Sequence, residues 1–215
     1  MSGIKLIAGL GNPGKEYEDT RHNAGFWWVD TLVRAQGAKW SREPRFSALV
    51  ARLRSDAGDV LVLKPQAYMN ESGRAVGALA QFYRIPAPHI LVVHDELDLP
   101  PGGVKLKLGG GSGGHNGLKD IESALGTREY WRLRLGIGHP RDWLAKFGAE
   151  APEVIDYVLH SPGREDMGSI REAMEKSLDL LPLLLEGKMD KAVMQLHTAP
   201  KAKGESTEVK PEKKT

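Results

Sequence analysis

Short apolar runs alternate along the chain with segments of helical periodicity, and this alternation constrains the fold more than any other feature. Ile4–Leu10 and His89–Val93 are almost continuously apolar, which is typical of strands buried on both faces of a sheet. Ala24–Gln36 carries apolar residues at helical spacing, and Gly37 is a favourable residue just after a helix end. Strands that alternate with helices predict an α/β sandwich around a mixed, largely parallel sheet.

The remaining predicted elements keep this alternation. Ser72 is expected to cap one helix, and Pro182 to kink another. The sequence contains no internal repeat, so we predict a single domain over residues 1–197. Further strands are expected at Phe46–Leu53, Asp59–Lys64, Val104–Leu108 and Trp131–Ile137, and further helices at Ser72–Arg84, Asn116–Leu125, Met167–Leu185 and Met189–Leu196.

The overall charge does not identify a nucleic-acid binder. The formal net charge is only +2, and the stretch 201–215, with five lysines and three glutamates, accounts for all of it. Any RNA-binding surface must therefore be a local patch. After His197 the chain turns to Lys, Glu, Pro and Thr, so residues 198–215 are predicted to form a disordered tail.

The absence of cysteine excludes disulfides, thiolate catalysis and Cys-based zinc sites. The apolar run at the N-terminus is too short for a signal peptide, and no segment approaches membrane-spanning length. We therefore expect a soluble, cytoplasmic protein with no membrane partner.

The stretch Gly9–Gly14 matches the G-x-G-x-x-G fingerprint of dinucleotide-binding folds and follows a predicted strand. Asp30 even lies near the distance expected for a ribose-binding acid. The context argues against this function, because Pro13 and the polar stretch Lys15–Arg21 delay the helix, and Asp30 falls inside it. We favour glycines that allow a tight turn, which presents Asn12 at the carboxyl end of the first strand.

Polar side chains gather at four places just beyond predicted strand ends. In open α/β sheets ligands bind outside the carboxyl ends of the strands, so these clusters predict one shared site. Taken singly, each cluster has a plainer interpretation, because asparagine and aspartate are common in turns and caps and a histidine can be structural. The clusters are Asn12 with Tyr17 and His22, Met69-Asn70, His94-Asp95-Glu96, and His115-Asn116.

A histidine, a carboxylate and several amides together fit ester hydrolysis by water, without a covalent intermediate. Histidine suits the general base, since its ordinary pKa of about 6.5 lies nearest to working pH. Asp95 can fix the tautomer of His22 and stabilise the imidazolium that forms on proton uptake. Asparagine amides can donate to a developing oxyanion and can read a peptide backbone. No serine stands in a G-x-S-x-G nucleophile elbow with a suitable context.

A glycine-rich loop, Gly109–Gly117, opens a predicted helix and carries His115 and Asn116. Free N–H groups at a helix start attract anions and carbonyl groups, although flexibility alone is a plainer explanation. Basic residues alternate on the two flanking strands, where residues two apart share a face and can bind phosphate. An ordinary solvated face explains that pattern equally well. These basic residues are Lys105, Lys107, Arg132 and Arg134.

Five longer stretches carry a family pattern: GLGNPGKEYEDTRHNAGF (9–26), YMNESG (68–73), HDELDLPPG (94–102), GGGSGGHNGLKDI (109–121) and LRLGIGHP (133–140). In order and spacing they resemble the bacterial-type peptidyl-tRNA hydrolases, over about residues 4–197. The resemblance implies a three-layer α/β/α sandwich, normally monomeric, that needs no cofactor and no metal. It also implies hydrolysis of the ester that links a peptide to the terminal ribose of tRNA, which recycles tRNA from aborted translation.

The resemblance also implies a role for each polar cluster. His22 matches the family's catalytic base and Asp95 its supporting carboxylate, and we place Asn12 with them. Lys107 and Arg134 match the pair thought to clamp the tRNA 5′ phosphate. Substrate-contacting positions are matched by Asn12, Met69, Asn70, His115 and Asn116, with Tyr17 nearby.

The chain departs from the family pattern after His139-Pro140, where Arg141-Asp142-Trp143 replaces the usual glycine and nearby lysine. The stretch 141–153 is also longer than usual and falls where a lid over the substrate is expected, so lid contacts cannot be transferred. Glu71 stands where an apolar residue is common.

Two other functions stay open on the sequence alone. An RNA-binding module that has lost catalysis is one, although the retained His22, Asp95 and Asn12 argue against it. A metal hydrolase is the other, although no HExxH or comparable ligand spacing occurs. Its candidate ligands are His22, His94, Asp95, Glu96 and His115.

Overall fold

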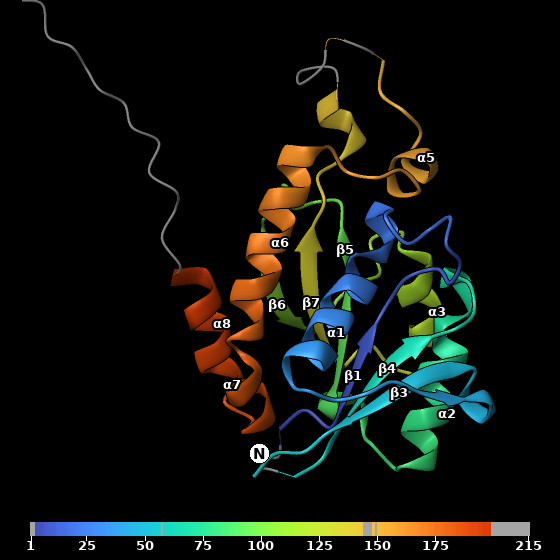
Figure 1. The fold of residues 1–215 in the computed structure, drawn as a ribbon, viewed down its shortest axis with the longest axis vertical. Coiled ribbons are helices and arrows are strands. Elements are labelled where there is room, and N and C mark those ends of the chain that lie inside the picture. Colours follow the sequence, from blue (N-terminus) through green and yellow to red (C-terminus); the bar gives the residue numbers. More distant parts are fainter. Residues whose placement is uncertain (1–2, 57, 144–147, 149, 199–215) are drawn as a thin grey trace, which may run out of the picture.

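The computed structural model describes residues 3–56, 58–143, 148 and 150–198, and these residues form one sheet between two layers of helices (Figure 1). The strands are β1 (Leu6–Gly9), β2 (Ser41–Glu43), β3 (Ala48–Leu53), β4 (Val60–Pro65), β5 (Ile90–Glu96), β6 (Val104–Leu108) and β7 (Trp131–Gly136). Their order in the sheet is β2-β3-β4-β1-β5-β7-β6. Strands β4, β1, β5 and β7 run parallel at the centre, and β2, β3 and β6 pair antiparallel at the edges. The predicted mixed sheet with a parallel centre is confirmed.

Helices cover both faces of this sheet, which confirms the three-layer α/β/α sandwich (Figure 1). Each layer buries its own apolar cluster, and Ile7 of β1 points into one cluster while Leu6 and Ala8 point into the other. Within the described part of the chain, no helix combines the length and apolarity needed to span a bilayer. One face carries α1 (Ala24–Ala35), α6 (Arg164–Leu178), α7 (Leu181–Leu185) and α8 (Met189–Thr198), and the other carries α2 (Ser72–Phe82) and α3 (Asn116–Leu125).

Two details of the predicted helices are wrong. The single helix expected over Met167–Leu185 is two helices, because α6 ends at Leu178 and α7 begins at Leu181. Pro182 lies in the first turn of α7, where its missing N–H leaves no intrahelical hydrogen bond unmade. Ser72 is the first residue of α2 rather than its cap, and its hydroxyl donates to the Met69 carbonyl over 2.8 Å.

Strand β5 extends beyond the predicted end at Val93, so that His94, Asp95 and Glu96 lie on the strand rather than after it. Side chains alternate along a strand, and Val93 belongs to the cluster under α1. Asp95 therefore points to the side of α1, and His94 to the opposite side. This alternation decides which of the three can reach His22.

Two predictions fall largely on residues that the structure does not describe. The tail predicted at 198–215 lies outside the described residues apart from Thr198, where α8 ends. Residues 144–147 and 149 of the 141–153 stretch also lie outside them. The domain limits at residue 197 stay a prediction.

Candidate active site

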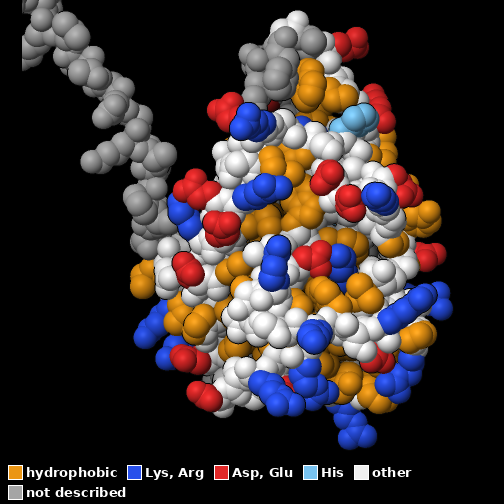
Figure 2. Space-filling model, viewed as in Figure 1, with side chains coloured by type: hydrophobic (Ala, Val, Ile, Leu, Met, Phe, Trp, Pro, Cys, Tyr) orange, Lys and Arg blue, Asp and Glu red, His pale blue; other side chains and the backbone are white. Residues whose placement is uncertain are grey.

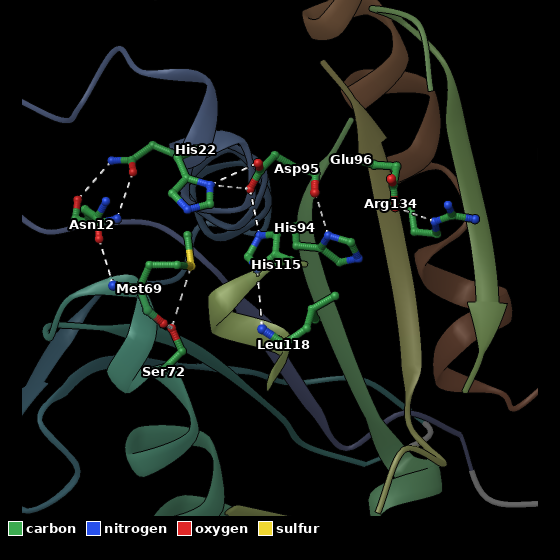
Figure 3. Close-up of polar contacts among 11 residues, drawn as sticks. Asn12, His22, Met69, Ser72, His94, Asp95, Glu96, His115, Leu118 and Arg134 are labelled. Atoms are coloured by element: carbon green, nitrogen blue, oxygen red, sulfur yellow. Dashed lines mark hydrogen bonds and ion pairs between the residues drawn. The ribbon is translucent and has the colours of Figure 1, made fainter. Parts of the chain in front are cut away.

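The carboxyl ends of the parallel strands meet at one edge of the sheet, and several of the predicted polar residues gather there (Figure 3). His22 lies in the short 3-10 helix η1 (Arg21–Asn23), just before α1. Asp95 lies near the end of β5, and His115 caps the start of α3. Segments far apart in the sequence thus place two imidazoles around one carboxylate.

Asp95 binds both imidazoles. Nδ1 of His22 lies 3.0 Å from each carboxylate oxygen, and Nε2 of His115 lies 2.9 Å from Oδ1. The Asp95 side chain is 2% exposed and that of His22 is 12% exposed. An ionised carboxylate can only accept hydrogen bonds, so the facing ring nitrogens carry the protons. Nε2 of neutral His22 then carries a lone pair, as a general base requires.

Burial and charge act in opposite directions on this pair. Burial alone would raise the pKa of Asp95, but the charge and hydrogen bonds of the two histidines outweigh it and hold that pKa well below its ordinary value. Burial would lower the pKa of His22, but the charge and hydrogen bond of Asp95 outweigh it, and that pKa is raised. Asp95 is therefore ionised at neutral pH, and His22 is a stronger base than an isolated histidine.

His115 differs from His22 because both of its ring nitrogens have protein partners. Nε2 donates to Asp95, and Nδ1 accepts from the backbone N–H of Leu118 over 3.4 Å, which caps α3. The rings of His115 and His22 lie 5.0 Å apart, centroid to centroid. The structure thus brings a residue predicted to contact substrate into the group around Asp95, where it shares the carboxylate.

His94 points away from that carboxylate. Its Nδ1 donates to the backbone carbonyl of Asp95 over 2.6 Å, and its ring meets that of His115 edge-on, 5.1 Å between centroids. Burial, followed by the charge of His115, lowers the pKa of His94 to about 3. His94 is therefore neutral near neutral pH. Its Nε2 has no hydrogen-bond partner among the described residues.

Asn12 is held by a second asparagine that the sequence analysis did not single out. The Asn12 N–H donates to Oδ1 of Asn23 over 2.8 Å, and Nδ2 of Asn23 donates back to the Asn12 carbonyl over 3.0 Å. Oδ1 of Asn12 accepts from the Met69 N–H over 2.7 Å, which fixes the amide orientation. Within the described chain, Nδ2 of Asn12 makes no hydrogen bond and remains a free donor. Asn23 could have been found from the sequence, because it directly follows His22 in the stretch 9–26 that resembles the family pattern.

In the Gly9–Gly14 motif, Gly9 allows close packing between α1 and β1. Helix α1 crosses β1 so closely that a Cβ on Gly9 would lie 2.4 Å from the Gly25 carbonyl oxygen. A Cβ on Gly25 would lie 2.3 Å from the Val93 carbonyl oxygen. Asp30 lies inside α1 and accepts from Nζ of Lys64 over 2.6 Å, so it is engaged within the protein. The position of Asp30 and its contact with Lys64 argue against a ribose-binding role for Asp30, and so against a dinucleotide site.

A pocket of about 470 Å³ opens beside the two histidines, with Asn116 and the glycine-rich loop on its border. One wall is apolar and comes from α5 (Val154–Val158), which no sequence pattern had marked as functional. Asn12 borders a separate pocket of about 350 Å³. The wall residues are Val154, Ile155 and Val158.

The other predicted contact residues line neither of these two pockets. Tyr17 is half-buried, and its ring meets the ring of Tyr68 edge-on at 6.3 Å. Met69 is buried in the 3-10 helix η3 (Met69–Glu71), and Asn70 beside it is exposed. The structure thus brings His22, Asp95 and His115 into direct contact with one another. Of this second group, Met69 contacts Asn12 through its backbone N–H.

The basic residues of β6 and β7 share one face of the sheet but not one role. The antiparallel register places Lys107 opposite Arg132, and Arg134 lies two residues further along β7. Arg132 is buried and donates to two backbone carbonyls of the glycine-rich loop, so it holds that loop. Nε of Arg134 donates to Glu96 over 2.7 Å, and Lys107 is exposed.

The structure also allows a test of the metal-site alternative. Among the described residues, one group has possible metal-ligand atoms that all lie within 4.8 Å of one another, and it consists of His22, Asp95 and His115. His94 and Glu96, the other candidate ligands, are not part of this group. In the observed geometry both imidazoles direct N–H groups at the carboxylate. A metal ion binds deprotonated ring nitrogens, so it would have to replace these two hydrogen bonds.

Comparisons with known proteins agree with the motif resemblance. The family model described as peptidyl-tRNA hydrolase matches residues 6–205. A curated peptidyl-tRNA hydrolase from Methylobacillus flagellatus is 57% identical over 201 residues, which cover 94% of this chain and 100% of that protein. A crystal structure of a peptidyl-tRNA hydrolase with N-propanol matches with a TM-score of 0.86 at 40% identity, covering 94% of this chain and 98% of that one. The crystal structure of peptidyl-tRNA hydrolase from Acinetobacter baumannii matches with a TM-score of 0.84 at 41% identity, covering 92% and 96%.

Proposed function

Since the chain belongs to the peptidyl-tRNA hydrolase family and hydrolyses the ester bond between peptide and tRNA, we propose that a water molecule activated by His22 performs the attack. The observation that carries this proposal is the contact of His22 Nδ1 with both oxygens of the Asp95 carboxylate, 3.0 Å each. This contact keeps the proton on Nδ1 and the lone pair on Nε2. A water molecule in the pocket can then lose a proton to Nε2.

The proposed reaction uses two proton transfers through the same nitrogen. As the water oxygen bonds to the ester carbonyl carbon, its proton passes to Nε2 of His22, and ionised Asp95 stabilises the resulting imidazolium. When the bond to the ribose oxygen breaks, the proton passes to that oxygen and His22 returns to its neutral form. The products are a peptide with a free carboxyl group, which then ionises, and a tRNA with a free ribose hydroxyl.

Asn12 is proposed as the donor to the oxyanion that develops on the ester carbonyl. Its amide is fixed because Oδ1 accepts from Met69 N–H and the backbone is held by Asn23. A donor that is already oriented needs no reorganisation during the reaction, and such donors supply much of the rate enhancement in acyl transfer. An amide is also too weak a base to compete with His22 for the proton of the water.

We propose that Tyr17, Met69, Asn70, His115 and Asn116 bind the peptidyl end of the substrate. A free α-amino group is usually charged, whereas a peptidyl group offers a neutral amide N–H at the same place. The exposed side-chain carbonyl of Asn70, or a backbone carbonyl near it, is suited to accept that N–H, which would discriminate against aminoacyl-tRNA. The internal bonds of His115 suggest that it contributes mainly through Asp95.

Lys107 and Arg134 are proposed to bind the 5′ phosphate of tRNA. Both lie on the same face of neighbouring strands, beside the glycine-rich loop. Figure 2 shows acidic and basic side chains interspersed over most of the face that carries α1 and α6. The formal net charge of only +2 supports a local phosphate contact rather than a continuous basic surface. Glu96 now accepts from Arg134, and a phosphate would compete with it for the guanidinium.

We further propose that the chain acts as a monomer in the cytoplasm and needs neither a metal ion nor another cofactor. The substrate class supports this location, because translation produces peptidyl-tRNA there. A base, its carboxylate and an oxyanion donor that all come from one chain support a monomer.

Release of the acyl group from N-acetyl-aminoacyl-tRNA tests the proposed mechanism. His22→Ala is expected to abolish turnover while leaving the fold and most of the tRNA binding intact, and His89→Gln, at the far end of β5, serves as a remote histidine control with the parent rate. The parent enzyme is expected to keep its rate in a chelator. A parent-like rate for His22→Ala would show that the base is wrong. Loss of activity in the chelator, with recovery on a divalent ion, would favour the metal hydrolase.

A further inference from the structure

Arg21 directly precedes the proposed base, and it is a buried charge with only 4% of its surface exposed. Its Nη1 donates to the carbonyl oxygens of Tyr157, over 3.1 Å, and His160, over 3.0 Å. The Arg21 backbone N–H donates to the same His160 oxygen over 3.1 Å. Its Cζ lies 4.1 Å from the centroid of the Tyr157 ring. The side chain therefore binds the segment 157–160 through both hydrogen bonds and a cation–π contact.

The segment that Arg21 binds begins in helix α5, which forms the apolar wall of the catalytic pocket. Helix α5 lies directly beyond η1 at the carboxyl end of the sheet (Figure 1), and three of its side chains, Val154, Ile155 and Val158, line the pocket. Tyr157 anchors this helix a second time, because its hydroxyl donates to the Ile137 carbonyl over 2.7 Å, just after the end of β7. Arg21 and Ile137 thus hold α5 at two points.

Two consecutive side chains therefore bind opposite sides of one pocket. His22 contacts Asp95 at the end of β5, and Arg21 contacts α5. The turn η1 that carries both is three residues long, so the base and the wall cannot move far independently.

We propose that Arg21 is a positioning residue, which sets the place of α5 relative to His22 and thereby determines how tightly the pocket holds the ester end of peptidyl-tRNA. The inference rests on the proposed role of His22 as the base.

A contribution to fold stability does not by itself explain why a buried arginine occupies position 21. Nε of Arg21 is buried without a hydrogen-bond partner among the described residues. A buried charge that is incompletely bonded costs free energy, and apolar residues of similar volume often serve stability as well or better. A role in positioning α5 relative to His22 explains why an arginine is present despite this free-energy cost.

The test compares Arg21→Met, Arg21→Lys and the control Arg34→Met in steady-state and single-turnover release from N-acetyl-aminoacyl-tRNA. Methionine keeps the unbranched stem and removes the charged contacts, so we expect KM to rise about tenfold, the equivalent of one charge-assisted hydrogen bond. Lysine keeps the charge but loses the planar guanidinium, and an intermediate rise is expected. Arg34 is exposed on α1, and its replacement removes one positive charge without touching the pocket, so KM should not change.

Two further readouts separate positioning from a merely structural role. The acid limb of the pH profile of kcat should stay in place in Arg21→Met, because the contact of His22 with Asp95 is untouched. Hydrogen exchange should speed up at the amides of Tyr157 and Leu159 but not in β5. A folded Arg21→Met with the parent KM overturns the proposal, even if it melts at a lower temperature. If that variant does not fold, an unchanged KM in Arg21→Lys overturns it.

A shift of the acid limb also overturns the proposal, since Arg21 would then act on the base itself. Failure of the proposed function is recognised separately, because it appears as turnover by His22→Ala.

Discussion

Replacement of Asp95 by asparagine tests the centre of the mechanism with almost no change in shape. The substitution removes a negative charge that lies 3.0 Å from Nδ1 of His22 and 2.9 Å from Nε2 of His115. Unit charges at about 4 Å, the scale that separates the centres of the two groups, interact by about 4 kcal/mol at an effective dielectric constant of about 20. Loss of that stabilisation of the imidazolium slows the reaction by about 10³-fold.

The tautomer of His22 adds to this loss. One of the two carboxylate oxygens that now face Nδ1 would become an NH₂ group, which favours the proton on Nε2, where it blocks the base. A comparable substitution in serine hydrolase triads lowers kcat by about 10⁴-fold for this reason. We therefore expect kcat of Asp95→Asn to fall between about 10³- and 10⁴-fold.

The pH dependence should change as well. Catalysis needs neutral His22, so the parent rate rises with pH through the raised pKa of His22 and then levels off. In Asp95→Asn the burial of His22 remains while the charge of Asp95 is gone, so the pKa of His22 falls. The acid limb is therefore expected to move to lower pH, although the plateau is lower.

Single-turnover release from N-acetyl-aminoacyl-tRNA across the titration range of histidine measures both effects. Asp59→Asn is a matched control, since Asp59 is an exposed carboxylate paired with Arg52 and lies outside the pocket. A rate for Asp95→Asn within tenfold of the parent, or an acid limb that stays in place, would refute the reasoning.

Three other predictions follow from named contacts. Asn12→Ala removes the oriented donor and should lower kcat about 10²- to 10³-fold with little change in KM, as for other oxyanion donors; a loss confined to KM would contradict the assignment. Arg134→Ala should raise KM only for tRNA that carries a 5′ phosphate, and Glu96→Gln, which frees Arg134, should lower it; equal effects on dephosphorylated tRNA would exclude the phosphate contact. His94 has a pKa of about 3 in the folded protein against 6.5 ordinarily, so the unfolded chain takes up the proton first and stability falls as pH drops from about 6.5 towards 3. The loss should amount to a few kcal/mol, and thermal melts of His94→Gln over this window should show a smaller decline; an identical decline would show that another group is responsible.

The order and type of the main elements could be read from the sequence because they depend on local patterns. Continuous apolar runs mark strands buried on both faces, and helical spacing marks the layers that cover them. The errors in the predicted elements also arise from local patterns that allow more than one structure. Pro182 was interpreted as a kink within one helix. Proline is also common in the first turn of a new helix, and the pattern of apolar residues does not distinguish the two cases.

The residue types of the site could also be anticipated, because the motifs carry them and the chemistry of ester hydrolysis needs them. The pairing of His22 with Asp95 was among the predictions, but the other hydrogen-bond partners of the site residues could not be anticipated. His115 was predicted to contact substrate, yet it shares Asp95 with His22. Arg132 looked like Arg134, yet it is buried and holds the glycine-rich loop.

By itself, then, the sequence determined an alternating α/β chain with a histidine, a carboxylate and amides after its strands. Only the tertiary structure decided that β5 continues to Glu96, which places the side chains of Asp95 and His94 on opposite sides of the sheet, because side chains alternate along a strand and one residue of register reverses them. The contacts of Asp95 bridge 73 residues to His22 and 20 to His115. Such contacts arise from how the packed layers bring distant segments together, which no local pattern encodes.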